Sequence, residues 1–297
     1  MRGPNGERTI YRHQTHPSQM FAGRKLLIAT KHEKEKAIAP ILERELGVTC
    51  FVSEKFDTDT LGTFTGEVAR RDDPITTARK KCRMAMELNE CDLAVASEGS
   101  FGPHPLMFFV HADEEILLFL DKKNNIEIMV RELTMETNFN GREIKTAEEL
   151  ADFASAANFP AHGLIARNAK DDSTEIIKGI TDWQKLSEVF AYFTGKYNSL
   201  FVETDMRAMF NPTRMKVIET ATHKLVDKIK SCCPQCNTPG FGITDRKVGL
   251  PCSLCGFPTQ STLCYVYTCQ HCAFIKEEMY PNHKTAEDPG CCSVCNP

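Results

Sequence analysis

Cysteine pairs in the last 66 residues constrain this chain more than any other feature. Of its 14 cysteines, eleven lie in residues 232–297. Two residues between paired cysteines let the backbone curl so that both thiolates face one metal ion, and two such pairs complete a tetrahedral site. The segment therefore predicts two metal sites of the zinc-ribbon type. The eight expected ligands are Cys233 and Cys236, Cys252 and Cys255, Cys269 and Cys272, and Cys292 and Cys295.

Spacing favours one way of combining the four pairs. A gap of 15 residues separates the first pair from the second, and 19 residues separate the third from the fourth. Both gaps fit a hairpin between two pairs, so we expect the first pair to join the second and the third to join the fourth. A crossed pairing is the alternative. Three cysteines are left over, of which the first and last could each replace a neighbouring ligand: Cys232, Cys264 and Cys291.

The expected metal is zinc in a structural role, with iron as the alternative for four-thiolate sites. Residues 232–297 contain few large aliphatic side chains, so bound metal must supply much of their folding energy. A disulfide framework is the competing interpretation. It is disfavoured because the chain shows no export signal: residues 1–22 are polar, and the apolar run 106–120 is interrupted by charges. We therefore expect a cytoplasmic protein with no membrane segment.

Charge indicates what kind of partner the cysteine-rich segment suits. It carries four basic and five acidic residues, and each four-thiolate zinc site adds about two negative charges. An acidic module lacks the phosphate contacts that dominate nucleic-acid affinity, so nucleic acid is not an expected partner. The segment is expected to be structural or to dock a protein.

The rest of the chain predicts an α/β domain. Apolar strands such as Lys25–Thr30 and Leu93–Ala96 alternate with helical patterns such as the one that Asp73 and Pro74 begin. One hairpin turn, at residues 121–125, interrupts the alternation. This order favours a mixed sheet with helices on both faces. The expected organisation is a flexible tail at 1–22, an α/β domain at 23–231 and a double zinc-ribbon module at 232–297.

One stretch of the α/β domain predicts a site. The strand Leu93–Ala96 runs directly into Ser97, Glu98, Gly99 and Ser100. In open α/β sheets ligands bind at the carboxyl ends of strands. A carboxylate there could hold a cation, and a glycine would let a phosphate approach the backbone.

Three segments resemble house-cleaning nucleoside triphosphate pyrophosphatases, the inosine/xanthosine triphosphatase and Maf-like enzymes. They are Ala29–His32 with the lysines that follow, Thr77–Cys82 with the Glu98 strand end, and Thr213–Met215. The resemblance covers about residues 22–231 and implies a carboxylate that works with Mg²⁺. His32 stands where the family has Asn, and a family histidine before Arg214 is missing. The whole chain more closely resembles an uncharacterised bacterial family known only as a domain of unknown function.

The resemblance implies a Mg²⁺-dependent pyrophosphatase or related phosphohydrolase that acts on a nucleotide or small phosphate. Glu98, with Glu67 or Asp205, would hold the metal ion on a triphosphate. The expected phosphate-binding and substrate-binding residues are Thr30, Lys34, Lys36, Gly99, Ser100, Arg214 and Lys216. The alternative is a zinc-binding protein without enzymatic activity, whose α/β domain binds a nucleotide or phosphate and whose ribbons dock a protein.

Overall fold

The structure is a computed structural model, and it describes residues 17–53, 72–170 and 172–297. The chain divides into two compact units, one of residues 23–227 and one of residues 1–22 with 228–297. Each unit is considered by itself below.

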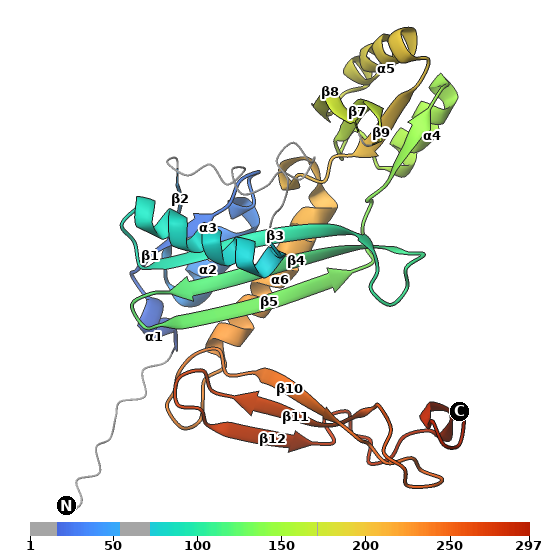
Figure 1. The fold of residues 1–297 in the computed structure, drawn as a ribbon. Coiled ribbons are helices and arrows are strands. Elements are labelled where there is room, and N and C mark those ends of the chain that lie inside the picture. Colours follow the sequence, from blue (N-terminus) through green and yellow to red (C-terminus); the bar gives the residue numbers. More distant parts are fainter. Residues whose placement is uncertain (1–16, 54–71, 171) are drawn as a thin grey trace, which may run out of the picture. The chain divides into compact units, whose positions relative to one another are not determined.

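A five-stranded mixed sheet forms the centre of the unit 23–227, with the strand order β2-β1-β3-β4-β5 (Figure 1). β1 is parallel to both β2 and β3, whereas β3, β4 and β5 are joined antiparallel. The chain leaves β1 toward β2 on one side and returns to β3 on the other side, so β1 and β3 form a topological switch point. The bounds are β1 Lys25–Ala29, β2 Thr49–Val52, β3 Leu93–Pro103, β4 His111–Asp121 and β5 Ile126–Thr134.

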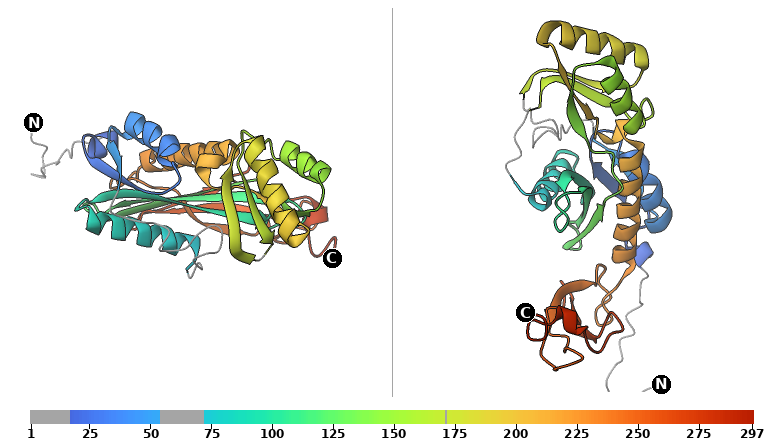
Figure 2. Two further views of the ribbon diagram at one scale, coloured as in Figure 1. Left: turned by 90° about the horizontal axis from the view of Figure 1, so that it is seen from above. Right: turned by 90° about the vertical axis from the view of Figure 1, so that its right-hand side faces the viewer.

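Helices cover both faces of this sheet, as predicted. Helix α3 (Pro74–Leu88) lies on one face, and α2 (Glu35–Leu46) and α6 (Pro212–Lys230) lie on the other (Figure 2). Asp73 caps α3 by accepting hydrogen bonds from the amides of Ile75 and Thr76, with Pro74 at the first helical position. The core on this face joins α3 to β1, β3 and β4 through Ala78, Cys82, Ala85, Leu27, Ala94, Ala96 and Leu118.

A second sheet, which the sequence pattern did not distinguish from the first, has the strand order β6-β9-β7-β8 and is entirely antiparallel. Its strands are β6 Gly141–Ile144, β7 Leu164–Ala169, β8 Asp172–Ile180 and β9 Leu200–Thr204. Helices α4 (Ala147–Ala156) and α5 (Trp183–Tyr197) pack on it around Leu150, Phe153, Leu186 and Phe193. The expected capping box of Thr146 and Glu149 is present at α4.

Two local predictions were wrong. The spacing of Thr181 and Gln184 predicts a capping box, but helix α5 is capped by Asp182, whose side chain accepts from the amide of Lys185 at 2.7 Å. The sequence also predicts a strand near residues 107–110, but these residues form the turn between β3 and β4, closed by a hydrogen bond from the amide of His104 to the carbonyl of Val110. Apolar side chains in this turn remain exposed to solvent, among them Leu106 and Phe108.

The second unit contains a three-stranded antiparallel sheet of β10 (Ile243–Val248), β11 (Thr262–Thr268) and β12 (Ile275–Met279). A short 3-10 helix, η3 (Pro289–Cys291), follows. Part of the segment expected to be a flexible tail forms the short helix α1 (Pro17–Phe21), and Phe21 is fully buried. No helix in the described part of the chain is both long enough and apolar enough to cross a membrane.

Candidate functional site

All eight predicted metal ligands gather into two cysteine tetrads. Tetrad 1 consists of Cys233, Cys236, Cys269 and Cys272, and tetrad 2 consists of Cys252, Cys255, Cys292 and Cys295. Measured Sγ–Sγ distances are 3.5 and 3.7 Å in tetrad 1 and 3.7 and 3.9 Å in tetrad 2. Four sulfurs at about 2.3 Å from a central zinc would be roughly 3.8 Å apart, whereas a disulfide bond is about 2.0 Å long. The tetrads therefore have the dimensions of metal sites.

The tetrads are crossed, so the favoured pairing of first with second and third with fourth was wrong. The strands of the sheet explain this result. β10 separates the first cysteine pair from the second, β11 separates the second from the third, and β12 separates the third from the fourth. Each strand carries the chain about 15–20 Å from one end of the sheet to the other. Successive pairs consequently lie at opposite ends, and only alternate pairs can share a metal ion.

The three spare cysteines differ in their surroundings. Cys264 is buried in β11, Cys232 is partly buried, and Cys291 is exposed. None of the three belongs to a tetrad. All 14 cysteines are free thiols, so the structure contains no disulfide framework.

The predicted site in the α/β domain lies where β1 ends. β1 pairs with β3 as far as Ala29 opposite Ala96, and β3 then continues without this neighbour through Ser97, Glu98 and Gly99. Lys34, the residue directly before α2, extends its side chain toward this part of β3. The arrangement places polar groups at the carboxyl end of β1 and at the switch point, where ligands bind in open α/β sheets.

Four side chains from four elements form what we name the charged cluster: Lys34, Ser97, Glu115 and Arg214. Glu115 on β4 lies at its centre and is fully buried. One of its oxygens accepts from Arg214 Nε at 2.6 Å, and the other accepts from Ser97 Oγ at 3.1 Å and lies 3.5 Å from Lys34 Nζ. Lys34 also donates to Ser97 Oγ at 3.0 Å. Lys34 and Arg214 are only 5% and 4% exposed.

Burial and charge act against each other within the cluster. Burial lowers the pKa of Lys34 to about 8, although Glu115 favours its charged form. Burial would raise the pKa of Glu115, but Arg214 and Lys34 outweigh it and hold that pKa below its usual range. The charge of Glu115 therefore favours the ionised form of the buried Lys34.

Gly99 is required by the packing of the charged cluster. A Cβ atom at this position would lie 2.1 Å from Arg214 Nη2 and 2.4 Å from Glu115 Oε1. Gly99 faces Glu115 across the β3–β4 pair, so the arginine and the glutamate pack directly on the strand backbone. Asn211 fixes the other end of the arginine, because its side chain accepts from the amide of Arg214 at 3.0 Å at the start of α6.

Glu98 points to the opposite face of the sheet from the charged cluster, because successive residues of a strand alternate between faces. Its carboxylate lies 2.5 Å from the ammonium group of Lys81 on α3, and both side chains are buried. The charges of Glu98 and Lys81 also act on the pKa of Lys34. The ion pair and the charged cluster therefore lie close together on the two sides of β3, just beyond the end of β1.

Several predicted site residues lie outside this arrangement. Lys36 is exposed and pairs with Glu33, and Lys216 is exposed. Thr30 donates its hydroxyl hydrogen to the carbonyl of Lys31, and Ser100 is partly buried beyond Gly99. The carboxylate of Asp205 accepts hydrogen bonds from Arg207 and from the amide of Gly179 at the second sheet. Glu67 lies outside the described residues.

The carboxylates expected to act with Glu98 on Mg²⁺ were Glu67 or Asp205; Asp205 is instead bonded at the second sheet, and Glu67 lies outside the described residues. Among the described residues, the only groups of three or more potential metal ligands are the two cysteine tetrads.

Sequence reasoning missed three residues near the site. In the sequence, Glu115 and its neighbour Asp113 were noticed only as charges that interrupt an apolar run. They are two residues apart, and this spacing puts both side chains on one face of a strand. Lys81 was assigned to a solvated helix face, but it is 9% exposed and pairs with Glu98. Its place three residues after the buried Ala78 was the available signal.

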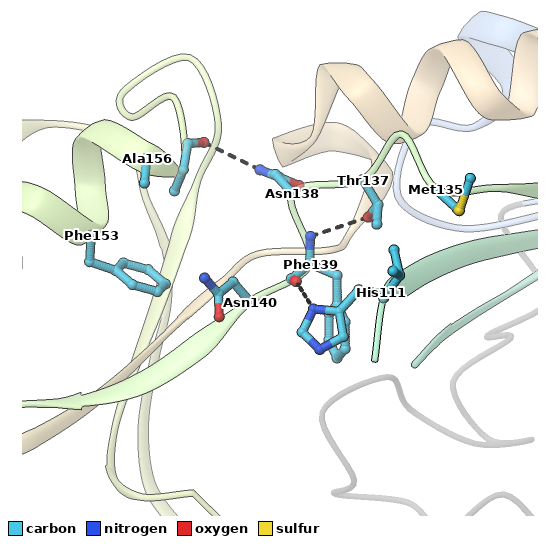
Figure 3. Close-up of a pocket in the computed structure, with 10 residues that line it drawn as sticks. His111, Met135, Thr137, Asn138, Phe139, Asn140, Phe153 and Ala156 are labelled. Atoms are coloured by element: carbon cyan, nitrogen blue, oxygen red, sulfur yellow. Dashed lines mark hydrogen bonds between the residues drawn. The ribbon is translucent and has the colours of Figure 1, made fainter. Parts of the chain in front are cut away.

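A cavity of about 310 Å³ is lined by the start of β4, the segment that follows β5 and the end of α4 (Figure 3). Its wall includes Phe139, whose ring centre is 5.8 Å from that of Phe101, and the guanidinium carbon of Arg214 is 4.9 Å from the centre of the Phe101 ring. Polar side chains in the wall are already oriented: His111 Nδ1 lies 2.8 Å from the carbonyl oxygen of Phe139, and Asn138 accepts from Asn211 at 2.9 Å. The cavity is of a size that can accommodate part of a small molecule.

The fold and the tetrads define an α/β protein with a metal-binding ribbon module. The family model described as "Domain of unknown function (DUF6671)" matches residues 81–297, so the chain belongs to this family. The search of curated proteins found no match.

Among solved structures, protein VC0702 from Vibrio cholerae is similar over 69% of this chain and 94% of its own, with 12% identity and a TM-score of 0.33. A likeness at that score carries no argument about this chain. The resemblance to nucleoside triphosphate pyrophosphatases stays a prediction.

Proposed function

We propose that the α/β domain is a Mg²⁺-dependent hydrolase of phosphoric anhydrides that acts on a nucleoside triphosphate or a related small phosphate. The observation that carries the proposal is the gathering of Lys34 and Arg214 at the carboxyl end of β1, beside a glycine on β3. Two buried cations at a topological switch point suit an anionic ligand. Phe101 contacts both Arg214 and the cavity-lining Phe139, so the cavity offers room for another part of the substrate.

Each residue has a role in this proposal. Lys34 and Arg214 bind phosphate oxygens and stabilise the charge that develops as water attacks phosphorus. Glu98 is the carboxylate for the metal ion, and Lys81 holds it in place until the metal arrives. One protein carboxylate is sufficient, because Mg²⁺ in such sites keeps several waters and binds the substrate phosphates. The metal ion would polarise the phosphoryl group.

The test is pyrophosphate and phosphate release from a panel of standard and deaminated nucleoside triphosphates with Mg²⁺. We expect release by the wild type, loss of at least about a hundredfold with Glu98→Gln, and little change with Glu127→Gln. Glu127 is a matched control because it also pairs with α3, through Arg79 at 2.7 Å. Folded, zinc-loaded wild type that releases nothing from any nucleotide would contradict the proposal.

A second candidate is a binding protein without turnover. It is favoured by the surroundings of Glu98, which is already paired with Lys81, and by the finding that among the described residues only cysteines form groups of three or more potential metal ligands. In this alternative the charged cluster binds a phosphate and the ribbon module docks a protein. Tetrad 2 presents apolar side chains that suit docking, with Leu254 74% and Val294 56% exposed. Phosphate binding without hydrolysis would favour this candidate.

We also propose that each tetrad holds one structural zinc ion. The sulfur–sulfur distances support a tetrahedral metal site, and cysteines without disulfide bonds fit a reducing compartment such as the cytoplasm. Elemental analysis of the purified protein tests it, with about two zinc atoms expected per chain. Iron in place of zinc, or a content near one, would contradict it.

A further inference from the structure

Asp113 is a buried carboxyl that the proposed reaction does not use. It lies on β4 two residues before Glu115, on the same face of the sheet, and its residue is 1% exposed. Within the described part of the chain, its Oδ1 has no hydrogen-bond partner. A carboxylate oxygen without a partner in such a position is costly while it is charged.

The neighbours of Asp113 determine how easily it gains a proton. Burial and the negative charge of Glu115 raise the pKa of Asp113 to about 7, although Arg214 and Lys34 favour its charged form. Its cross-strand neighbours are uncharged, namely Phe101 on β3 and Thr134 on β5. The charged groups that act on Asp113 are Glu115 on β4, Lys34 at the start of α2 and Arg214 at the start of α6. His111, two residues earlier on β4, and Glu132, which pairs with Glu115 across β4 and β5, lie on the same face of the sheet.

Glu115 and Asp113 differ in how firmly they are held. Glu115 accepts from Arg214 and Ser97 and lies beside Lys34, so it stays ionised. Asp113 depends on the same two cations but makes none of these close contacts. An anion that binds Lys34 and Arg214 would remove the attraction that keeps Asp113 ionised and would add a repulsion.

We propose that Asp113 takes up a proton from solvent when an anion binds to Lys34 and Arg214. The inference rests on the anion-binding part of the proposed function, and it does not require hydrolysis. The anion brings negative charge into the buried site, and protonation of Asp113 removes one negative charge from it. The net charge of the site therefore changes by less than the charge of the anion. Ligand affinity and proton uptake are then linked.

The linkage has a definite sign. A proton bound together with the anion makes affinity highest at low pH. Affinity falls as pH rises through the pKa of free Asp113, by up to about tenfold per pH unit. Lys34, with a pKa of about 8, adds a second loss at higher pH. The interval from about pH 6 to 7.5 therefore lies below the pKa of Lys34 and spans that of Asp113.

The experiment is titration calorimetry of the full zinc-loaded protein with sulfate, whose charge is constant in this pH interval. Measurement at pH 7.5 in two buffers of different ionisation enthalpy gives the number of protons bound. We expect about 0.5 to 1 proton per sulfate for the wild type and less than about 0.3 for Asp113→Asn, which keeps the shape of the side chain. Glu127→Gln, on the opposite face, should match the wild type.

The outcomes separate this inference from the proposed function. Sulfate binding without proton uptake, or equal uptake by Asp113→Asn, would overturn the inference alone. No sulfate binding at pH 6 by folded protein would overturn both the inference and the anion site. Proton-linked sulfate binding by a protein that hydrolyses no nucleotide would support the inference and contradict only the proposed hydrolase activity. If the variant does not fold, the pH dependence of sulfate affinity in the wild type decides between the same outcomes.

Discussion

The cysteine tetrads and the charged cluster around Glu115 both gather polar side chains, but different sources stabilise them. Each tetrad brings together four thiols whose deprotonated forms repel one another, so it needs a cation from outside the chain. The charged cluster contains its own counter-charges, with Glu115 between Lys34 and Arg214.

This difference predicts which change disrupts each site. Removal of metal should affect one unit of the chain, because the tetrads lie entirely within residues 233–295. Removal of one charge should affect the five-stranded sheet, because Glu115 joins β4 to the starts of α2 and α6.

Metal removal is the largest expected effect. Chelation should unfold the β10–β12 sheet and leave β3 and β4 intact, since structural zinc contributes about 10–16 kcal/mol in small zinc domains. Hydrogen exchange followed by mass spectrometry measures this, with fast exchange expected in β11 and unchanged protection in β3. Equal loss of protection in both strands would contradict the separation of the two units.

Replacement of Glu115, the central carboxylate of the charged cluster, should have the next largest effect. Glu115→Gln leaves the buried Lys34 and Arg214 without their partner, which should cost about 3–5 kcal/mol of unfolding free energy. The partly exposed pair of Arg79 and Glu127 gives a matched control, and Glu127→Gln should cost less than about 1 kcal/mol. Urea unfolding at pH 7 compares them. If the two variants were equally stable, Glu115 would not be the centre of the cluster.

Neutralising Asp113 should act in the opposite direction. Its folded pKa of about 7 exceeds the unfolded value, so the native state binds more protons between about pH 4 and 7 and loses stability as pH rises through that range. Asp113→Asn should therefore be about 1–4 kcal/mol more stable than the wild type at pH 8, and the difference should vanish toward pH 4. Urea midpoints at both pH values test the sign, and a variant less stable at pH 8 would refute it.

The glycine that supports the cluster gives the smallest effect. Gly99→Ala forces its Cβ against Arg214 and Glu115, and it should cost about 1–3 kcal/mol. Gly102 lies three residues farther along β3, and a Cβ atom added there would meet nothing within 4 Å, so Gly102→Ala should be nearly neutral. Thermal unfolding distinguishes them, and two equal melting temperatures would show that the close approach at Gly99 is unimportant.

Local patterns were readable from the sequence. Cys-x-x-Cys pairs identify metal ligands because both sulfurs come from one turn, and Asp73 with Pro74 identifies a helix start because the cap is made within three residues. The apolar run before Glu98 identified a buried strand in the same way.

The pairing of strands that are distant in the chain could not be predicted from the sequence. The role of Glu115 follows from its position opposite Gly99, which depends on how β3 pairs with β4. The crossed tetrads follow from β10, a strand that was not predicted because all six of its residues are exposed and lack the alternation of a half-buried strand. Glu98 was identified as a site residue, but the face to which it points depends on the same β3 alternation that places Ser97 and Gly99 opposite it.

The most direct test of the central claim is a crystal structure of the zinc-loaded protein with Mg²⁺ and a non-hydrolysable nucleoside triphosphate. The account predicts phosphate oxygens within hydrogen-bond distance of Lys34 and Arg214 at the end of β1, with Glu98 released from Lys81 and bound to the metal ion. A triphosphate bound elsewhere, with the contacts of Glu115 to both cations and the pair of Glu98 and Lys81 unchanged, would contradict it.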